Sequence, residues 1–133
     1  MNNITKFMIA ICTALIAVVS SAQMINDNKT MEQNTKTTLI VTSTINPAEM
    51  ESLQAYVQKV MPMLLELGGK VIKRTKITDV YFGEKPAELL LVMDFPSKEA
   101  LQAMFDSEAY QAVIPLRNKG FSKVDILFAE ELK

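Results

Sequence analysis

Histidine and tryptophan are absent from this sequence of 133 residues, and cysteine occurs only once, at Cys12. Histidine is the commonest metal ligand in proteins and the commonest general base near neutral pH. The carboxylates Asp79, Glu84 and Glu88 have no histidine or cysteine to complete a transition-metal site. We therefore expect no metal site and no cofactor.

An excess of positive charge is also missing. The chain has 14 Lys and Arg against 15 Asp and Glu, and its basic residues are scattered rather than gathered in a stripe. Proteins that bind nucleic acid or an anionic membrane surface usually carry a basic face. We therefore expect no nucleic acid among its partners. Glycine and proline are scarce, with 4 and 5 residues, and 49% of residues are apolar, which is typical of one globular domain.

The first feature that is present is an apolar N-terminal segment. Lys6 precedes a largely apolar run over residues 7–19, and Ser-Ser-Ala at 20–22 supplies small residues before Gln23. This pattern is typical of a secretory signal peptide that is cleaved after residue 22. An uncleaved membrane anchor is the alternative, but a spanning helix needs about 20 apolar residues. We expect an exported protein, periplasmic or secreted, with no stable membrane insertion after cleavage of the signal peptide 1–22.

Polar residues without periodicity fill positions 23–36, which we interpret as a flexible spacer. The folded domain is therefore predicted to occupy residues 37–133. It begins with a β-branched segment, residues 38–45, which has the composition of a strand.

A helix is predicted to follow this strand. Asn46 is a candidate N-cap, Pro47 suits the first helical position, and Glu49 lies where a capping box would place it. Tyr56 lies beside the apolar stripe and is expected to pack in the core. The two glycines Gly68-Gly69 end the helix. The predicted stripe consists of Met50, Leu53, Val57, Val60, Leu64 and Leu67.

The remaining elements complete a recognisable order. They are a second strand bent near Thr75, a third strand, a second helix capped by Ser97, a short helical piece and a fourth strand. The strands are predicted over residues 70–82, 88–95 and 121–130. The second helix carries the apolar residues Leu101, Met104 and Phe105, and the short helical piece, after a second cap at 106–108, carries Tyr110, Val113 and Ile114. The order β-α-β-β-α-β predicts an α+β fold of the ferredoxin-like type, in which helices cover one face of an antiparallel four-stranded sheet.

The apolar run Leu89–Met93 argues for a second layer. A strand with water on one face alternates apolar and polar residues, and this run does not. The helices of the domain cover only one face of the sheet. We therefore expect the other face to pair with a second copy of the chain in a homodimer.

Several pieces of the sequence resemble domain of unknown function 1330, a family of the dimeric α/β-barrel group with antibiotic-biosynthesis-monooxygenase-like relatives. The resemblance covers about residues 38–131 and implies a ferredoxin-like dimeric α/β barrel. Two positions depart from the family pattern, because Phe82 replaces a frequent acidic residue and Lys70 a common arginine. The matching pieces are Tyr56, Pro62, Gly68-Gly69, Arg74, Phe95-Pro96-Ser97, Ser107-x-x-Tyr110 and Pro115-Leu116-Arg117.

Four residues are candidates for ligand binding. Tyr110 and Arg117 are seven positions apart, and they suit a hydrogen bond and a cationic contact to a carboxylate or enolate. Structural roles are the alternative, with Arg117 at a helix end and Tyr110 packing its ring. Arg74 points either into a pocket between sheet and helices or to a surface ion pair. Asp94, at the end of a buried strand, is either a base or a hydrogen-bond acceptor for backbone groups.

No motif specifies a reaction, so three functions remain open. The first is a homodimeric small-molecule-binding module. The second is a cofactor-free monooxygenase-like or isomerase-like enzyme that uses a Tyr/Arg/Asp pocket. The third is a structural or stress-related envelope protein without a ligand.

Overall fold

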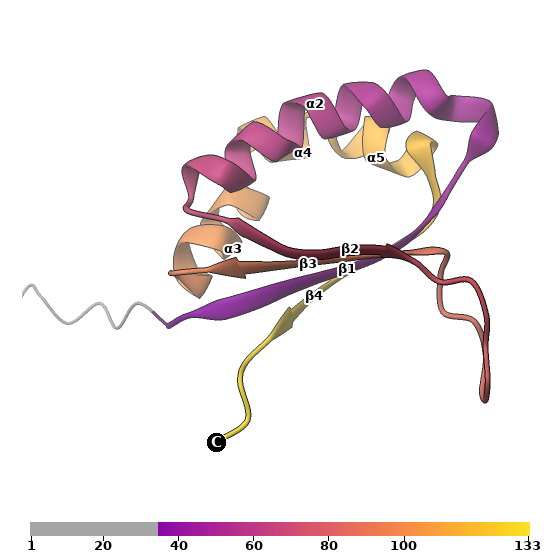
Figure 1. Cartoon of the computed structure of the whole chain (residues 1–133). Helices are drawn as coiled ribbons and strands as arrows, with labels where there is room; N and C mark the ends of the chain where they lie inside the picture. Colours follow the sequence, from indigo (N-terminus) through magenta and orange to yellow (C-terminus); the bar gives the residue numbers. More distant parts are fainter. Residues whose placement is uncertain (1–34) are drawn as a thin grey trace, which may run out of the picture. The chain divides into compact units, whose positions relative to one another are not determined.

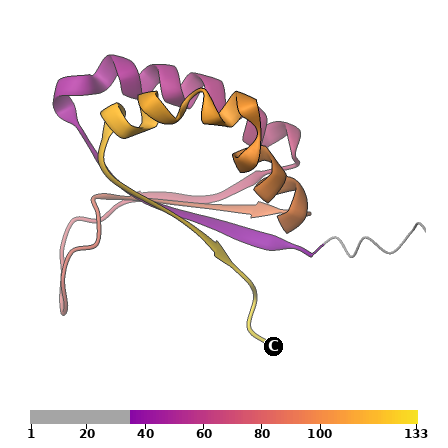
Figure 2. The same ribbon diagram turned by 180° about the vertical axis from the view of Figure 1, so that it is seen from behind.

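The computed structural model describes residues 35–133, so the predicted signal peptide and most of the predicted spacer lie outside the described residues. Four strands form one sheet, in the order β2-β3-β1-β4. The central strands are β1 (Thr37–Ile45) and β3 (Leu89–Phe95), and the edges are β2 (Lys70–Lys76) and β4 (Phe121–Ala129). All three pairings are antiparallel. The helices lie together on one side of the sheet (Figures 1 and 2), which confirms the predicted ferredoxin-like arrangement.

The first crossover is the helix α2 (Met50–Glu66), which follows a short 3-10 turn, η2 (Pro47–Glu49). The predicted cap is confirmed, because the Oδ1 atom of Asn46 accepts a hydrogen bond from the Ala48 amide at 3.2 Å. The capping box is wrong. The Glu49 carboxylate instead accepts a hydrogen bond from the Ser52 hydroxyl at 2.9 Å. At the other end Gly68 has φ +80°, the left-handed conformation that a helix C-terminus favours.

The buried stripe of α2 differs from the predicted one. Met50 and Val57 are exposed, and Tyr56 is buried in place of Val57. These two positions lie off the core-facing side because the predicted stripe repeats too quickly for a straight helix with its 3.6-residue period. The rest of the prediction is confirmed for Tyr56, which was expected in the core, and for three members of the stripe, Leu53, Val60 and Leu64.

The second crossover is broken into three helices, α3 (Lys98–Asp106), α4 (Glu108–Gln111) and α5 (Ile114–Gly120). The Ser97 hydroxyl accepts a hydrogen bond from the Ala100 amide at 3.1 Å, which confirms the predicted cap of α3. The Ser107 hydroxyl accepts one from the Tyr110 amide at 3.3 Å and begins α4. Each break turns the chain, so that α4 and α5 run back above the sheet beside α2 (Figure 1).

The second strand is shorter than predicted and bends at a different place. It ends at Lys76, and residues 77–88 form a long loop to β3. The register shift lies between Val71 and Lys73, not near Thr75. A bulge adds one residue to a strand, so each side chain after the bulge points to the opposite face of the sheet from the one it would otherwise occupy.

The two faces of β3 differ in what covers them. Met93 and Phe95 are buried beneath the helices, and Leu91 packs against the same core. Leu90 and Val92 point the other way and are only half buried. Together with their neighbours in register on β1 and β4 they form the apolar centre of what we call the helix-free face. This centre consists of Ile40, Leu90, Val92 and Leu127.

Candidate functional site

Tyr110 lies on α4 with 2% of its surface exposed, and its ring meets the Phe105 ring edge-on at a centroid distance of 4.8 Å. The ring therefore has the packing role that the sequence left open. Its hydroxyl has a second role. A buried phenol needs a hydrogen-bond partner, because an unpaired one costs about 1–3 kcal/mol.

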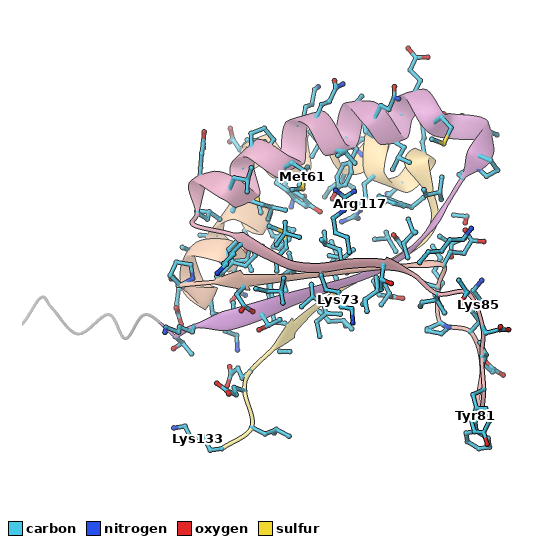
Figure 3. The ribbon with its side chains drawn as sticks, viewed as in Figure 1. Met61, Lys73, Tyr81, Lys85, Arg117 and Lys133 are labelled. Atoms are coloured by element: carbon cyan, nitrogen blue, oxygen red, sulfur yellow. The ribbon has the colours of Figure 1, made fainter. Side chains whose placement is uncertain are left out.

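Two side chains from other helices supply those partners. The Tyr56 hydroxyl of α2 lies 3.1 Å from the Tyr110 hydroxyl. The Nη1 atom of Arg117, on α5, donates a hydrogen bond to the Tyr110 hydroxyl at 3.2 Å. We call Tyr56, Tyr110 and Arg117 the Tyr–Arg cluster. It connects α2, α4 and α5 on the side of the sheet that the helices cover, and Figure 3 shows Arg117 between the helices and the sheet.

Tyr110 and Asn118 hold the Arg117 side chain in place, but they do not occupy all of its N–H donors. Its Nε and Nη2 atoms each donate to the Oδ1 atom of Asn118 at 3.2 Å. A guanidinium has more N–H groups than these three hydrogen bonds employ. Among residues 35–133, no further acceptor is bonded to Arg117. The half-buried guanidinium therefore retains donors that suit an anionic group.

The Tyr56 hydroxyl is the neutral donor of the cluster, which also contains the cation Arg117. Burial raises the pKa of Tyr56 well above its ordinary value of 10.0, and the hydrogen bond with Tyr110 acts in the same direction. The positive charge of Arg117 opposes this effect without cancelling it. Tyr56 therefore stays protonated at physiological pH and can donate, but it cannot serve as a base there.

Arg74 lies on the same side of the sheet as the cluster. It pairs in register with Leu91, which faces the helices. The bulge at Ile72 places it there, because without the extra residue its side chain would point to the helix-free face. Arg74 is exposed, and no hydrogen bond or ion pair joins it to another residue of 35–133. The structure thus places two arginines, Arg74 and Arg117, on one side of the sheet.

Asp94 lies on the opposite side. Met93 and Phe95 point to the helices, so Asp94 between them points to the helix-free face. Its Oδ1 atom accepts a hydrogen bond from the Thr38 hydroxyl at 2.7 Å. It also lines an open pocket of about 390 Å³ together with Lys70. The sheet therefore separates Asp94 from Tyr110 and Arg117, and the three do not form one Tyr/Arg/Asp pocket.

Sequence reasoning missed two members of this arrangement, Tyr56 as a polar partner and Asn118 as the residue that orients Arg117. A strict helical period would have found the first, since Tyr56 lies three residues after Leu53 and four before Val60. No comparable signal points to Asn118, because the contact depends on the side-chain conformations at the end of α5.

The antiparallel sheet of order β2-β3-β1-β4, with all helices on one face, defines the chain as an α+β protein of the ferredoxin-like class. Within this class the chain belongs to the family described as Domain of unknown function (DUF1330), whose sequence model matches residues 36–132. No curated protein matches the sequence.

Solved structures share this fold at low identity. A protein of unknown function from Rhodopseudomonas palustris has 16% identity and a TM-score of 0.64, over 84% of this chain and 93% of its own. A candidate antibiotic biosynthesis monooxygenase from Caulobacter crescentus has 12% identity and a TM-score of 0.54, over 75% and 92%. A protein from Arabidopsis thaliana has 10% identity and a TM-score of 0.54, over 73% and 96%. At such identities the similarity shows the fold alone.

No helix within residues 35–133 has the length and apolar character to cross a membrane. The same part of the chain contains no group of three or more His, Cys, Asp and Glu side chains arranged to hold a metal ion.

Proposed function

We propose that this protein is an exported homodimer that binds a small organic anion, a carboxylate or an enolate, at the Tyr–Arg cluster. One observation carries the proposal. Arg117 is fixed by Tyr110 and Asn118 and still has N–H donors without a partner in residues 35–133. A positioned guanidinium with spare donors matches the geometry of a planar oxyanion.

Other groups on the same side of the sheet favour an anionic ligand. Arg74, on the edge strand β2, adds a second positive charge to that side. Tyr56 remains protonated and can donate a hydrogen bond to the Tyr110 hydroxyl, which leaves the Tyr110 O–H to reach the ligand. Opposite charges in a partly water-excluded layer interact more strongly than at the surface.

Binding is better supported than catalysis. The enzyme hypothesis assigned the base to Asp94, and the sheet separates Asp94 from the cluster. The remaining groups include the cation Arg117 and the Tyr56 hydroxyl, which stays protonated and does not remove a proton at neutral pH. A ligand-free envelope protein is also less well supported, since it gives no reason for unused donors on a fixed arginine.

Export and dimerisation come from different parts of the chain. Export is supported by the signal-like segment before Gln23, and mass spectrometry of the mature protein should find a chain that starts at or near that residue. The homodimer is supported by the apolar centre of the helix-free face, whose residues Ile40, Leu90 and Val92 are only half buried in one chain.

A thermal-shift screen tests the ligand class. A ligand at 100 times its dissociation constant adds about 2.7 kcal/mol to stability, so a panel of carboxylic and enolisable keto acids should contain compounds that raise Tm. Arg117→Gln should abolish that rise because the oxyanion loses its guanidinium.

The matched control is Lys59→Gln, which removes the same charge from an exposed site on α2 and should leave the rise intact. A compound that still shifts Arg117→Gln as much as the wild type binds elsewhere, and that result would contradict the proposed site.

A further inference from the structure

The loop of residues 77–88 exposes aromatic side chains to an unusual degree. Tyr81 has a relative exposure of 105% and Phe82 one of 95%, so neither ring packs against its own protomer. The base of the loop is closed by a hydrogen bond from the Ile77 amide to the Glu88 carbonyl oxygen at 2.7 Å. The tip is thus presented on a defined stem rather than folded back on the domain.

The loop extends to the side of the sheet that the helices do not cover. In Figures 1 and 2 it leaves the end of the sheet between β2 and β3 and projects away from the helical layer. Figure 3 shows Tyr81 at its tip, well beyond the sheet. The aromatic tip therefore stands beside the space in front of the helix-free face.

We propose that loop 77–88 is a dimerisation arm, whose residues Tyr81 and Phe82 become buried against a second copy of this chain seated on the helix-free face. This inference rests on the homodimer of the proposed function. A two-fold axis makes the contact reciprocal, so each dimer buries two arms. Tyrosine and phenylalanine are residue types that homodimer interfaces favour.

Charge favours a second copy over a lipid surface as the occupant. The loop carries Asp79, Glu84 and Glu88 against the single cation Lys85, so an anionic bilayer would repel it. The strands of the helix-free face carry Lys70, Lys73 and Lys123 against Asp94 and Asp125, and the pocket beside Asp94 adds Lys36 against Glu130 and Glu131. The three strand lysines therefore offer the acidic arm partners of opposite charge on a second copy.

The absence of tryptophan from the sequence makes the arm easy to follow. Phe82→Trp would place the only indole of the protein at the arm tip. Its emission should shift to the blue as protein concentration rises through the dimer dissociation constant measured by sedimentation velocity. The control Leu65→Trp, at an exposed site on α2, should show no dependence on concentration.

A second variant measures the contribution of the arm. The double change Tyr81→Ser with Phe82→Ser should raise the dimer dissociation constant at least about tenfold, as removal of buried aromatic anchors does. The circular-dichroism spectrum and monomer stability should not change, since both rings are exposed in one chain.

Three results would overturn the inference. A wild-type monomer would remove the homodimer and the arm together. A stable dimer with unchanged affinity after the double change would leave the homodimer intact and reject the arm. A blue shift of Phe82→Trp that appears only when phosphatidylglycerol vesicles are added, and not with protein concentration, would assign the tip to a lipid surface instead.

Discussion

At the scale of single residues, the chemistry of this domain is concentrated where three helices meet above the sheet. The hydroxyls of Tyr56 and Tyr110 are hydrogen-bonded to each other, and Arg117 donates to the second. Each of the three residues comes from a different helix, and Tyr56 lies far from the other two in the chain. The cluster is therefore a product of packing, which brings three polar side chains from three helices within hydrogen-bond distance of one another.

The pKa of Tyr56 leads to a prediction about alkaline stability. Burial, and then the hydrogen bond with Tyr110, raise that pKa above the ordinary value of 10.0. The unfolded chain therefore loses a proton above about pH 10 that the native chain keeps, so the free energy of unfolding falls as pH rises beyond that point. Below it, this group adds no pH dependence.

Urea titrations of the wild type and Tyr56→Phe between about pH 9 and pH 11 should show a steeper decline for the wild type. At neutral pH the variant should be less stable by about 1 kcal/mol, because it lacks one buried hydrogen bond. Equal alkaline slopes for the two proteins would contradict the assignment.

At the scale of helices and strands, close packing decides more than local propensity. The backbone of α5 approaches α2 so closely at Gly120 that a Cβ atom there would lie 2.7 Å from the Cα atom of Leu53. That distance is too short for any side chain, so glycine is required for the approach itself. The same approach sets the position of Arg117, which lies less than one turn earlier on α5.

The Gly120→Ala variant should consequently separate α5 from α2 and destabilise the protein by about 1–3 kcal/mol, as overpacking does. The exposed neighbour Lys119→Ala supplies the control, since its side chain is not needed for the helix contact. Chemical denaturation of both variants measures the difference. A Gly120→Ala protein as stable as Lys119→Ala would show that the helices can adjust at no cost.

Elements whose signals are local could be predicted from the sequence. Ser97 and Gly68 bound their helices as expected, and the β-branched and apolar runs of β1 and β3 are strands. The end of β2 could not be predicted, because Val80, Tyr81 and Phe82 have the composition of a strand but no strand beside them. Asp94 was grouped with Tyr110 and Arg117 although strand alternation turns it to the other face.

At the scale of the whole molecule, the helices cover one face of the sheet and leave the other face exposed. The helices cover Leu91, Met93 and Phe95, and no part of residues 35–133 covers Leu90 and Val92 to the same extent. The proposed homodimer would bury Leu90 and Val92 by placing two helix-free faces together. An obligate interface of this kind typically buries about 2,000 Å² or more and is apolar at its centre.

The pair of variants Leu90→Lys and Leu91→Lys tests this account most directly. The wild type should scatter light as a particle of about twice the chain mass at micromolar concentration. Leu90→Lys should give a folded monomer, because its charge is buried only in the dimer, whereas Leu91→Lys should unfold the protomer, because its charge enters the core. A wild type that is monomeric with a folded circular-dichroism spectrum, or a Leu90→Lys protein that remains dimeric, would contradict the two-sheet homodimer.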